Sequence, residues 1–222
     1  MLHRSALAAA LAFATLSAHA TTYTFEPNYT QGVARWVHLG FANPSMQFGQ
    51  GEGILEFDPA DPGKASVTVT IPLDKFTTTV PDLDEHLRSA DFFETAKYPN
   101  ASFKSTRVEK GAMPDRYKVS GELEMHGVRK PVVLDVKFNR LGVNPRNSLP
   151  TIGFDATTVL KRSDFGLGKF VPQVSEEIRV EITAEAAESK SYAALLKKEA
   201  EEEAAEKAAA AAKAANDTQK KQ

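Results

Sequence analysis

Apolar and polar residues alternate in two-residue steps along most of the chain. Val67, Val69 and Ile71 share one face of a short segment whose other face carries Thr68 and Thr70. A period of two is typical of a β-strand with one buried face. The same alternation recurs at 117–125, 134–138 and 178–182, and less regular strands are expected at 23–25, 33–41, 53–57, 101–108 and 151–160. The pattern predicts a β-protein of eight or nine strands.

The connections between these segments favour antiparallel pairing. His126-Gly127 joins two alternating segments as a tight hairpin turn, and residues 58–63 form a loop rich in turn-forming residues. Parallel pairing would need crossover helices, for which almost no sequence exists before Glu185. The apolar faces must therefore meet one another. Alternation alone leaves both a sandwich and a closed barrel open.

A helical turn interrupts the strand pattern. Acidic residues at 82–85 precede His86 and Arg88, which is the charge order that a helix dipole favours. The turn cannot extend past the Tyr-Pro pair at 98–99, because a residue before proline prefers extended backbone. The aromatic pair at 92–93 fits either a lid over an apolar space or ordinary core.

The composition changes near the C-terminus. From Glu185 onward the chain is rich in Ala, Glu and Lys and has no Gly or Pro, so we expect a helix over 188–215. Its large apolar residues, Tyr192, Leu195 and Leu196, all lie near its beginning, which argues against a coiled coil. A solvated, partly frayed helix or low-complexity tail is favoured over a helix that binds a partner of unknown identity. Frequent charges exclude a membrane-spanning segment here.

The N-terminus has the pattern of an export signal. His3 and Arg4 precede an apolar run at 6–16 that is too short to span a bilayer, and Ala-His-Ala at 18–20 fits a cleavage site. We expect cleavage after Ala20 and an exported protein, with an uncleaved anchor as the less favoured alternative.

Composition narrows the function classes. The 222 residues, 42% apolar and 25% charged, suffice for one domain with tails. A formal net charge of −2 gives no electrostatic basis for binding nucleic acid or an anionic membrane. The absence of cysteine excludes disulfides and thiolate chemistry.

Common catalytic motifs are missing from the sequence. It contains no Gly-rich phosphate loop, His-Glu-x-x-His helix, Gly-x-Ser-x-Gly elbow or calcium loop. The histidines of the mature domain, His38, His86 and His126, do not have metal-ligand spacing, so neither a metal site nor a catalytic site is predicted. A hydrolytic site assembled in space from Ser163 with His86 or His126 is the weaker alternative.

Three separated sequences carry a family resemblance. These are DEHLRSADFFETAKYPNASFKS, GELEMHGVRKPVVLDVKF and KRSDFGLGKFVP, in this order. Together they resemble the YceI-like family of bacterial periplasmic polyisoprenoid-binding proteins, over roughly 21–186. The resemblance implies a lipocalin-like antiparallel eight-stranded β-barrel and decides between barrel and sandwich. The expected organisation is a signal peptide at 1–20, the barrel domain at 21–187 and an Ala/Glu/Lys-rich tail at 188–222.

If the family resemblance holds, the apolar residues that face the barrel interior are candidates to contact the lipid. Without the resemblance, the same residues would be interpreted as packed core, as in any β-protein. Arg88 and Asp164, next to aromatic residues, are candidates to hold a polar headgroup, while capping or mutual pairing is the more conservative interpretation of both. The predicted ligand-binding set is Val67, Val69, Arg88, Phe92, Phe93, Val119, Leu123, Leu134, Val136, Asp164, Phe165, Ile178 and Val180.

The expected function is non-catalytic binding, storage or transport of a polyisoprenoid or similar amphiphilic lipid in the periplasm, with no cofactor beyond the bound lipid. The alternative is a structural or stress-related interaction protein whose barrel is filled by its own side chains. The sequence leaves a homodimer open.

Overall fold

The structure, a computed structural model, describes residues 20–219. The predicted signal peptide at 1–20 lies almost wholly outside the described residues. Ten strands form one antiparallel sheet: β1 (Thr21–Phe25), β2 (Gln31–Arg35), β3 (Ser45–Gly49), β4 (Glu52–Phe57), β5 (Ser66–Pro72), β6 (Asn100–Lys110), β7 (Arg116–Met125), β8 (Val128–Val143), β9 (Pro150–Lys161) and β10 (Glu177–Glu188). The helices are α1 (Pro81–Arg88) and α2 (Ser189–Gln219), with 3₁₀ turns η1 (Pro27–Tyr29), η2 (Pro62–Lys64) and η3 (Arg162–Phe165).

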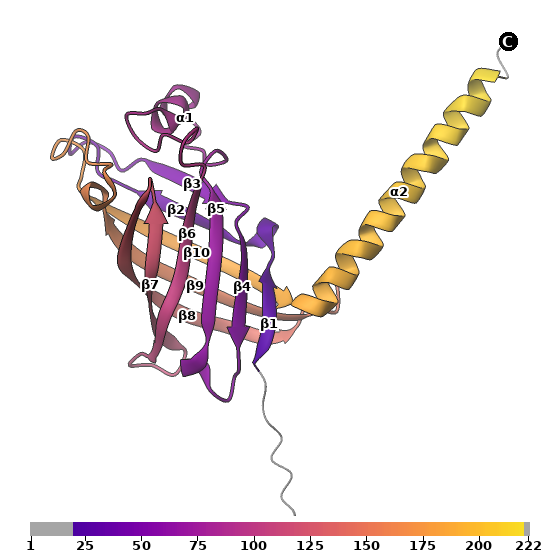
Figure 1. The fold of residues 1–222 in the computed structure, drawn as a ribbon, viewed down its shortest axis with the longest axis horizontal. Coiled ribbons are helices and arrows are strands. Elements are labelled where there is room, and N and C mark those ends of the chain that lie inside the picture. The colour runs from indigo at the N-terminus through magenta and orange to yellow at the C-terminus, as the bar shows by residue number, and fades with distance from the viewer. Residues whose placement is uncertain (1–19, 220–222) are drawn as a thin grey trace, which may run out of the picture.

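Eight of the strands close into a ring (Figure 1). Their order is β1-β4-β5-β6-β7-β8-β9-β10, and β10 pairs again with β1 through Tyr23–Glu188 to Phe25–Ala186. The predicted antiparallel eight-stranded barrel is therefore confirmed. Further along β10, residues 179–183 pair with β2, and β3 pairs in turn with β2. The β2–β3 hairpin thus extends the wall beyond the closed ring, and β3 is a strand that sequence reasoning did not predict.

The hairpin turn at His126-Gly127 has the predicted form. Both residues have positive φ, 53° and 72°, which is the backbone that a two-residue hairpin turn requires. A Cβ on Gly127 would lie 2.7 Å from the Tyr98 ring, so glycine also permits the close packing of Tyr98 on this turn. The turn therefore depends on glycine for its backbone and for its packing.

The helix α1 lies over one end of the barrel (Figure 1), which we call the upper end. The predicted helical turn at 82–88 is confirmed as α1. Its N-terminus begins with Pro81, and Asp82 and Asp84 in the first turn complement the helix dipole.

The C-terminal helix begins at the opposite, lower end and projects away from the barrel (Figure 1). Tyr192 is buried against Leu149 and Ala187, with Leu195 packed beside them, and the Tyr192 hydroxyl donates a hydrogen bond of 2.7 Å to Glu26. Tyr192 and Leu195 are two of the three large apolar residues at the beginning of the tail, and the third, Leu196, is half-exposed. No helix among residues 20–219 is long and apolar enough to cross a membrane.

Candidate functional site

Packed side chains fill the lower part of the barrel. Phe57 lies within ring-contact distance of both Phe138 and Phe154, at 6.2 Å between centroids in each case. Val67 and Val69, from the predicted ligand-binding set, pack against this cluster. Its buried members are Tyr23, Phe25, Leu55, Phe57, Ile152 and Ala186. In this part the barrel holds its own core.

A second cluster lies at the upper end. Phe76, almost fully buried, contacts Phe93 with 5.5 Å between ring centroids. Val180 is a buried member of this cluster and Ile178 packs against it. These three predicted site residues, Phe93, Ile178 and Val180, therefore stabilise the closure of the upper end beneath α1.

The interior positions of β7 and β8 in the predicted ligand-binding set belong to neither cluster, although Phe138 of β8 packs against the first. Val119 is buried, but Leu123, Leu134 and Val136 stay partly exposed to water although they lie on the apolar face of their strands. Val67 and Val69 are partly exposed as well but pack against the Phe57 cluster, whereas Leu123, Leu134 and Val136 pack against neither cluster.

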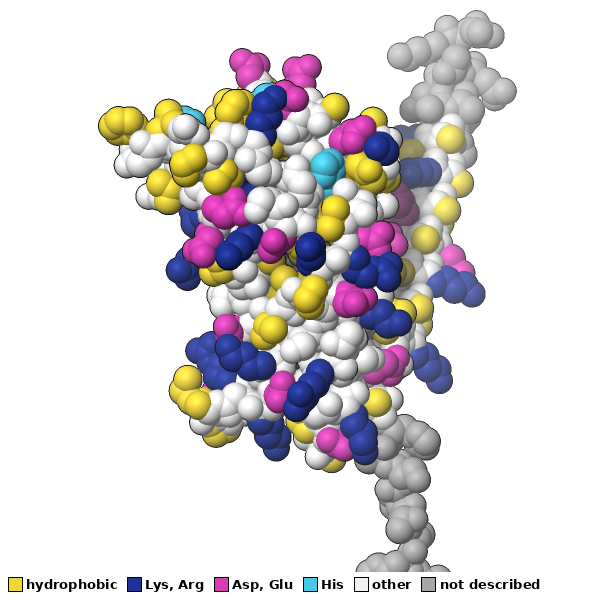
Figure 2. Space-filling model, turned by 60° about the vertical axis from the view of Figure 1, so that its left-hand side comes forward, with side chains coloured by type: hydrophobic (Ala, Val, Ile, Leu, Met, Phe, Trp, Pro, Cys, Tyr) yellow, Lys and Arg dark blue, Asp and Glu magenta, His cyan; other side chains and the backbone are white. Residues whose placement is uncertain are grey.

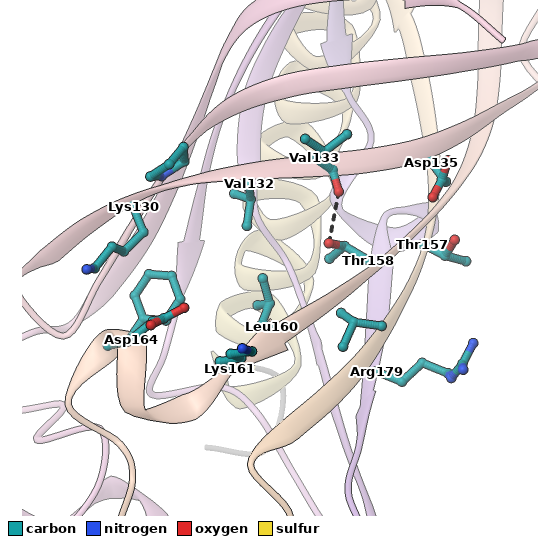
Figure 3. Close-up of a pocket in the computed structure, with 13 residues that line it drawn as sticks. Lys130, Val132, Val133, Asp135, Thr157, Thr158, Leu160, Lys161, Asp164 and Arg179 are labelled. Atoms are coloured by element: carbon teal, nitrogen blue, oxygen red, sulfur yellow. Dashed lines mark hydrogen bonds between the residues drawn. The ribbon is translucent and has the colours of Figure 1, made fainter.

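The wall opens between β8 and β9. Their pairing extends from Val143–Pro150 up to Asp135–Thr157, and beyond that pair residues 128–134 of β8 have no partner on β9. At this point the Thr158 hydroxyl donates a hydrogen bond of 2.9 Å to the Val133 carbonyl. Figure 3 shows the two strands diverging from this contact.

Pro131 lies on the unpaired part of β8, four residues beyond the last pair with β9. The Val133 carbonyl faces β9, and backbone groups two residues apart in a strand face the same neighbour. The nitrogen of Pro131 therefore faces β9 as well, and it has no hydrogen to donate. A proline at this position cannot extend the ladder to β9.

A cavity of about 580 Å³ occupies this lateral opening. Its lining combines the interior positions Val132 and Leu160 with the outward positions Val133 and Val159, which are 48% and 50% exposed. Residues from both faces of the wall therefore line this opening. Its volume falls in the range of small-molecule sites, about 300–1,000 Å³.

The turn η3 forms the upper boundary of the opening. Phe165 is buried and Asp164 is exposed, and both line the cavity. The structure therefore brings these two predicted site residues together with the β8–β9 opening. The His126 imidazole lies 2.9 Å from the Phe165 carbonyl, with Nδ1 as the donor, and so links η3 to the β7–β8 turn.

Arg162 holds the loop that follows η3, a role that sequence reasoning missed. Its guanidinium donates hydrogen bonds of 2.8–3.1 Å to the carbonyls of Leu167, Lys169, Val174 and Ser175. Burial lowers the pKa of the Arg162 guanidinium from its ordinary value, and nearby Glu176 opposes this shift. No local sequence signal separates this arginine from an exposed one.

Arg88 and Phe92, the remaining two residues of the predicted ligand-binding set, lie at the upper end of the barrel near α1. Arg88 donates to the carbonyls of Asp74 and Phe76, at 3.1 and 2.6 Å, and its guanidinium lies 4.8 Å from the Phe76 ring centroid. Phe92 is partly exposed and contacts His86 and Phe170. Arg88 and Asp164 therefore lie on different segments, with no ion pair between them among the described residues.

The structure does not assemble the hydrolytic alternative. The Ser163 hydroxyl donates to the Glu176 carboxylate, while His126 bonds the Phe165 carbonyl and His86 packs on Phe92. No hydrogen bond joins Ser163 to either histidine within residues 20–219. In the same part of the chain, no three His, Asp or Glu side chains form a metal-binding group.

The outer wall carries mixed charge. Figure 2 shows basic and acidic side chains interspersed over one face of the barrel. Lys118 pairs with Asp135, and Arg129 pairs with Glu124 at 2.6 Å. Such a surface does not present the basic stripe that nucleic acid binding requires.

Comparison with known proteins identifies the family. The model of the YceI-like domain matches residues 21–186. The chain belongs to the YceI-like family. It is 34% identical over 184 residues to "Protein YceI" of Escherichia coli O157:H7, an alignment that covers 82% of this chain and 95% of that protein.

Solved structures share the fold. BcnA of Burkholderia cenocepacia matches with a TM-score of 0.65 at 22% identity, covering 72% of this chain and 98% of BcnA. A domain from Saccharophagus degradans, described as a polyisoprenoid-binding domain implicated in plant cell wall breakdown, matches with a TM-score of 0.56 at 15% identity, covering 76% and 99%. At these identities the likeness concerns the fold.

Proposed function

We propose that this YceI-like protein binds a polyisoprenoid or similar amphiphilic lipid inside its barrel, along the interior faces of β7 and β8, without catalysing a reaction. The observation that carries the proposal is that the partly exposed interior residues Leu123, Leu134 and Val136 adjoin a wall with a lateral opening. The description of the Saccharophagus degradans relative as polyisoprenoid-binding supports the same ligand class.

The physical basis is burial of an apolar chain. Each CH₂ group transferred from water into the barrel contributes about 0.8 kcal/mol, and a prenyl chain supplies many such groups. Ordering the flexible chain and losing its free motion offset part of this gain. Storage or transport requires such reversible binding and no covalent step. We place this activity in the periplasm, after removal of the signal peptide following Ala20.

A filled barrel with a structural or interaction role is the second candidate. The aromatic cluster around Phe57, Phe138 and Phe154 favours it, because these rings already occupy the lower part of the interior. The two candidates differ in what happens on the β7–β8 side. A ligand-binding barrel loses affinity when that side is filled, whereas a filled barrel has no affinity to lose.

Competitive binding tests the proposal. Geranylgeraniol, a prenyl alcohol, would displace a polarity-sensitive dye from the wild-type protein. Leu134→Trp and Val136→Trp, which enlarge interior side chains, would abolish displacement, and Lys137→Trp on the outer face of the same strand would not. Circular dichroism confirms that each variant is folded. Equal displacement from all four proteins, or none from the wild type, contradicts the proposal.

A further inference from the structure

Two loops lie side by side at the upper end of the barrel (Figure 1). One is formed by residues 36–44, between β2 and β3, and the other by residues 166–175, between η3 and β10. Backbone hydrogen bonds join them, including one of 2.9 Å from the Leu39 amide to the Gln173 carbonyl. The two loops therefore form one structural unit.

Exposed apolar side chains gather on this unit. Phe41 is 92% exposed, so it stands almost clear of the rest of the protein. Leu39 is half-exposed, and its φ of 54° is a left-handed backbone that is uncommon for a large side chain. We call this set the apical patch, and its members are Val37, Leu39, Phe41, Phe170 and Val171. A single exposed apolar residue is ordinary, but five on two adjoining loops mark an interaction surface.

The two loops carry almost no charge. Apart from His38, Lys169 is the one acidic or basic residue in residues 36–44 and 166–175. The Lys169 ammonium group is already paired with the carboxylate of Asp91. Figure 2 shows apolar side chains gathered at the upper end of the molecule, above the mixed charges of the wall. Because an unpaired charge is costly to remove from water, an uncharged unit can enter an apolar medium at lower cost.

Most backbone N–H groups of the first loop have partners within the protein. Hydrogen bonds of 2.8–3.4 Å satisfy the amides of Trp36, Val37, His38, Leu39, Phe41 and Ala42. The apolar part of a bilayer offers no hydrogen-bond partners, so a segment that enters it must satisfy its own backbone groups. The loop that carries Phe41 largely meets this requirement.

We infer that the apical patch docks the protein on the surface of a lipid bilayer, with Phe41 and Leu39 entering it. A stable protein–protein interface takes roughly 20–30 residues from each side, far more than the five of the patch. A fluid bilayer needs no matching surface, and it takes up apolar side chains by burial alone. The formal net charge of −2 fits docking by burial rather than by charge. The inference concerns the outside of the barrel and does not depend on what the barrel holds.

Co-sedimentation with phosphatidylcholine vesicles tests the inference. The wild-type protein is expected to partition onto the vesicles, and Phe41→Ser to partition about tenfold less, because the burial of one phenylalanine side chain is lost. Met113→Ser is the matched control, since it removes an exposed apolar side chain from the β6–β7 turn, outside the patch. It should partition like the wild type. Phosphatidylglycerol added to the vesicles should not strengthen binding.

Fluorescence quenching locates the contact. Phe41→Trp should keep the partitioning and gain a fluorescence signal that phosphatidylcholine brominated on its acyl chains quenches. The wild type supplies the background, because Trp36 is the single tryptophan of the chain. Met113→Trp should show no such added quenching. Equal quenching of the two variants would overturn the inference.

The remaining outcomes separate docking from the proposed lipid site. Geranylgeraniol displacement from Phe41→Ser should match the wild type, and loss of displacement would mean that Phe41 belongs to the lipid site instead. A wild type that binds geranylgeraniol but does not partition onto vesicles overturns docking alone. Analytical ultracentrifugation covers the other occupant: a wild-type dimer that becomes a monomer in Phe41→Ser would make the patch an interface between copies and overturn the inference.

Discussion

The carboxylate of Asp84 accepts hydrogen bonds of 2.6 Å from both the backbone N–H and the hydroxyl of Thr78. A third bond, of 3.0 Å, comes from the Thr77 hydroxyl. Burial alone would raise the pKa of Asp84, but these hydrogen bonds and the nearby Arg88 guanidinium outweigh it and lower the pKa from its ordinary value. Asp84 thus attaches α1 to the segment that carries Phe76 over the upper end of the barrel.

Asp84→Asn is expected to destabilise the protein by about 2 kcal/mol, because buried donors lose a charged acceptor. Asp82→Asn, exposed on the same helix, is the control and should change stability by less than about 0.5 kcal/mol. Urea unfolding measures both. Equal effects would show that the Thr78 contacts do not stabilise the cap.

The hydrogen bonds between Asp84 and Thr78 also predict a pH dependence of the free energy of unfolding. Because the folded-state pKa of Asp84 is depressed, its contribution is fully present above the unfolded value of 3.8 and is lost as pH falls through the folded value. The stability difference between wild type and Asp84→Asn should therefore be constant near neutral pH and shrink below about pH 4. A difference that stays constant down to acid unfolding would contradict this.

Substitutions at Gly40 and Gly127 can distinguish the cost of a left-handed backbone from the cost of a side-chain clash. Gly40 and Gly127 have φ of 77° and 72°, but a Cβ on Gly40 would meet nothing within 4 Å, whereas one on Gly127 would meet Tyr98. Gly40→Ala should cost about 1 kcal/mol, the left-handed backbone penalty, and Gly127→Ala clearly more. Thermal or urea unfolding measures the two losses. Similar losses would mean that the Tyr98 ring moves aside without cost.

The docking of α2 depends on Tyr192. Burial, and then its hydrogen bond to Glu26, raise the pKa of the Tyr192 hydroxyl above its ordinary value of 10.0. Tyr192→Phe should increase amide exchange in the first turns of α2, while Leu196→Ala, at a half-exposed neighbouring position, should not. The Tyr192 contribution is present below pH 10 and lost as pH rises through the folded value, so the protection factors of these amides in the wild type, after correction for the pH dependence of intrinsic exchange, should fall only at alkaline pH. Equal amide exchange in Tyr192→Phe and Leu196→Ala would show that Tyr192 does not hold α2 on the barrel.

The lateral opening predicts a kinetic effect. Tryptophan at both Val133 and Val159 would narrow the outer mouth while leaving the interior unchanged. Association and dissociation of geranylgeraniol should both slow, with little change in equilibrium affinity, because the path is obstructed and the bound state is not. Glu181→Trp on the outer face of β10 is the control. Unchanged rates would indicate entry through another part of the barrel.

Most of the fold could be predicted because strand alternation is a local property. The segments at 117–125 and 178–182 lie within β7 and β10, and the hairpin at His126-Gly127 follows from turn chemistry. The short β3 was missed since Ser45–Gly49 is flanked by turn formers, and its pairing is with the neighbouring β2 and with Thr77, which is thirty residues away in sequence. Closure of the sheet into a barrel also depends on pairing between strands that are far apart in sequence. The prediction of a closed barrel therefore came from the family resemblance.

Less of the candidate site than of the fold could be predicted from the sequence. Alternation identifies Leu134 and Val67 equally as inward, but only the packing of the whole barrel shows that Val67 joins a filled cluster and Leu134 does not. The lateral opening depends on where one ladder ends. Pro131, just before the strand predicted at 134–138 and within the observed β8, is a local signal that could have indicated an unpaired segment.

Native mass spectrometry of the protein purified in native form from its own host tests the central claim most directly. The wild type should carry one prenyl-type lipid per chain, and collisional release should identify its headgroup. Leu134→Trp, purified in the same way and shown to be folded, should carry none, while Lys137→Trp should match the wild type. An unliganded mass for the wild type and both variants, under conditions that preserve the cargo of a known lipid carrier, would contradict a lipid-binding barrel.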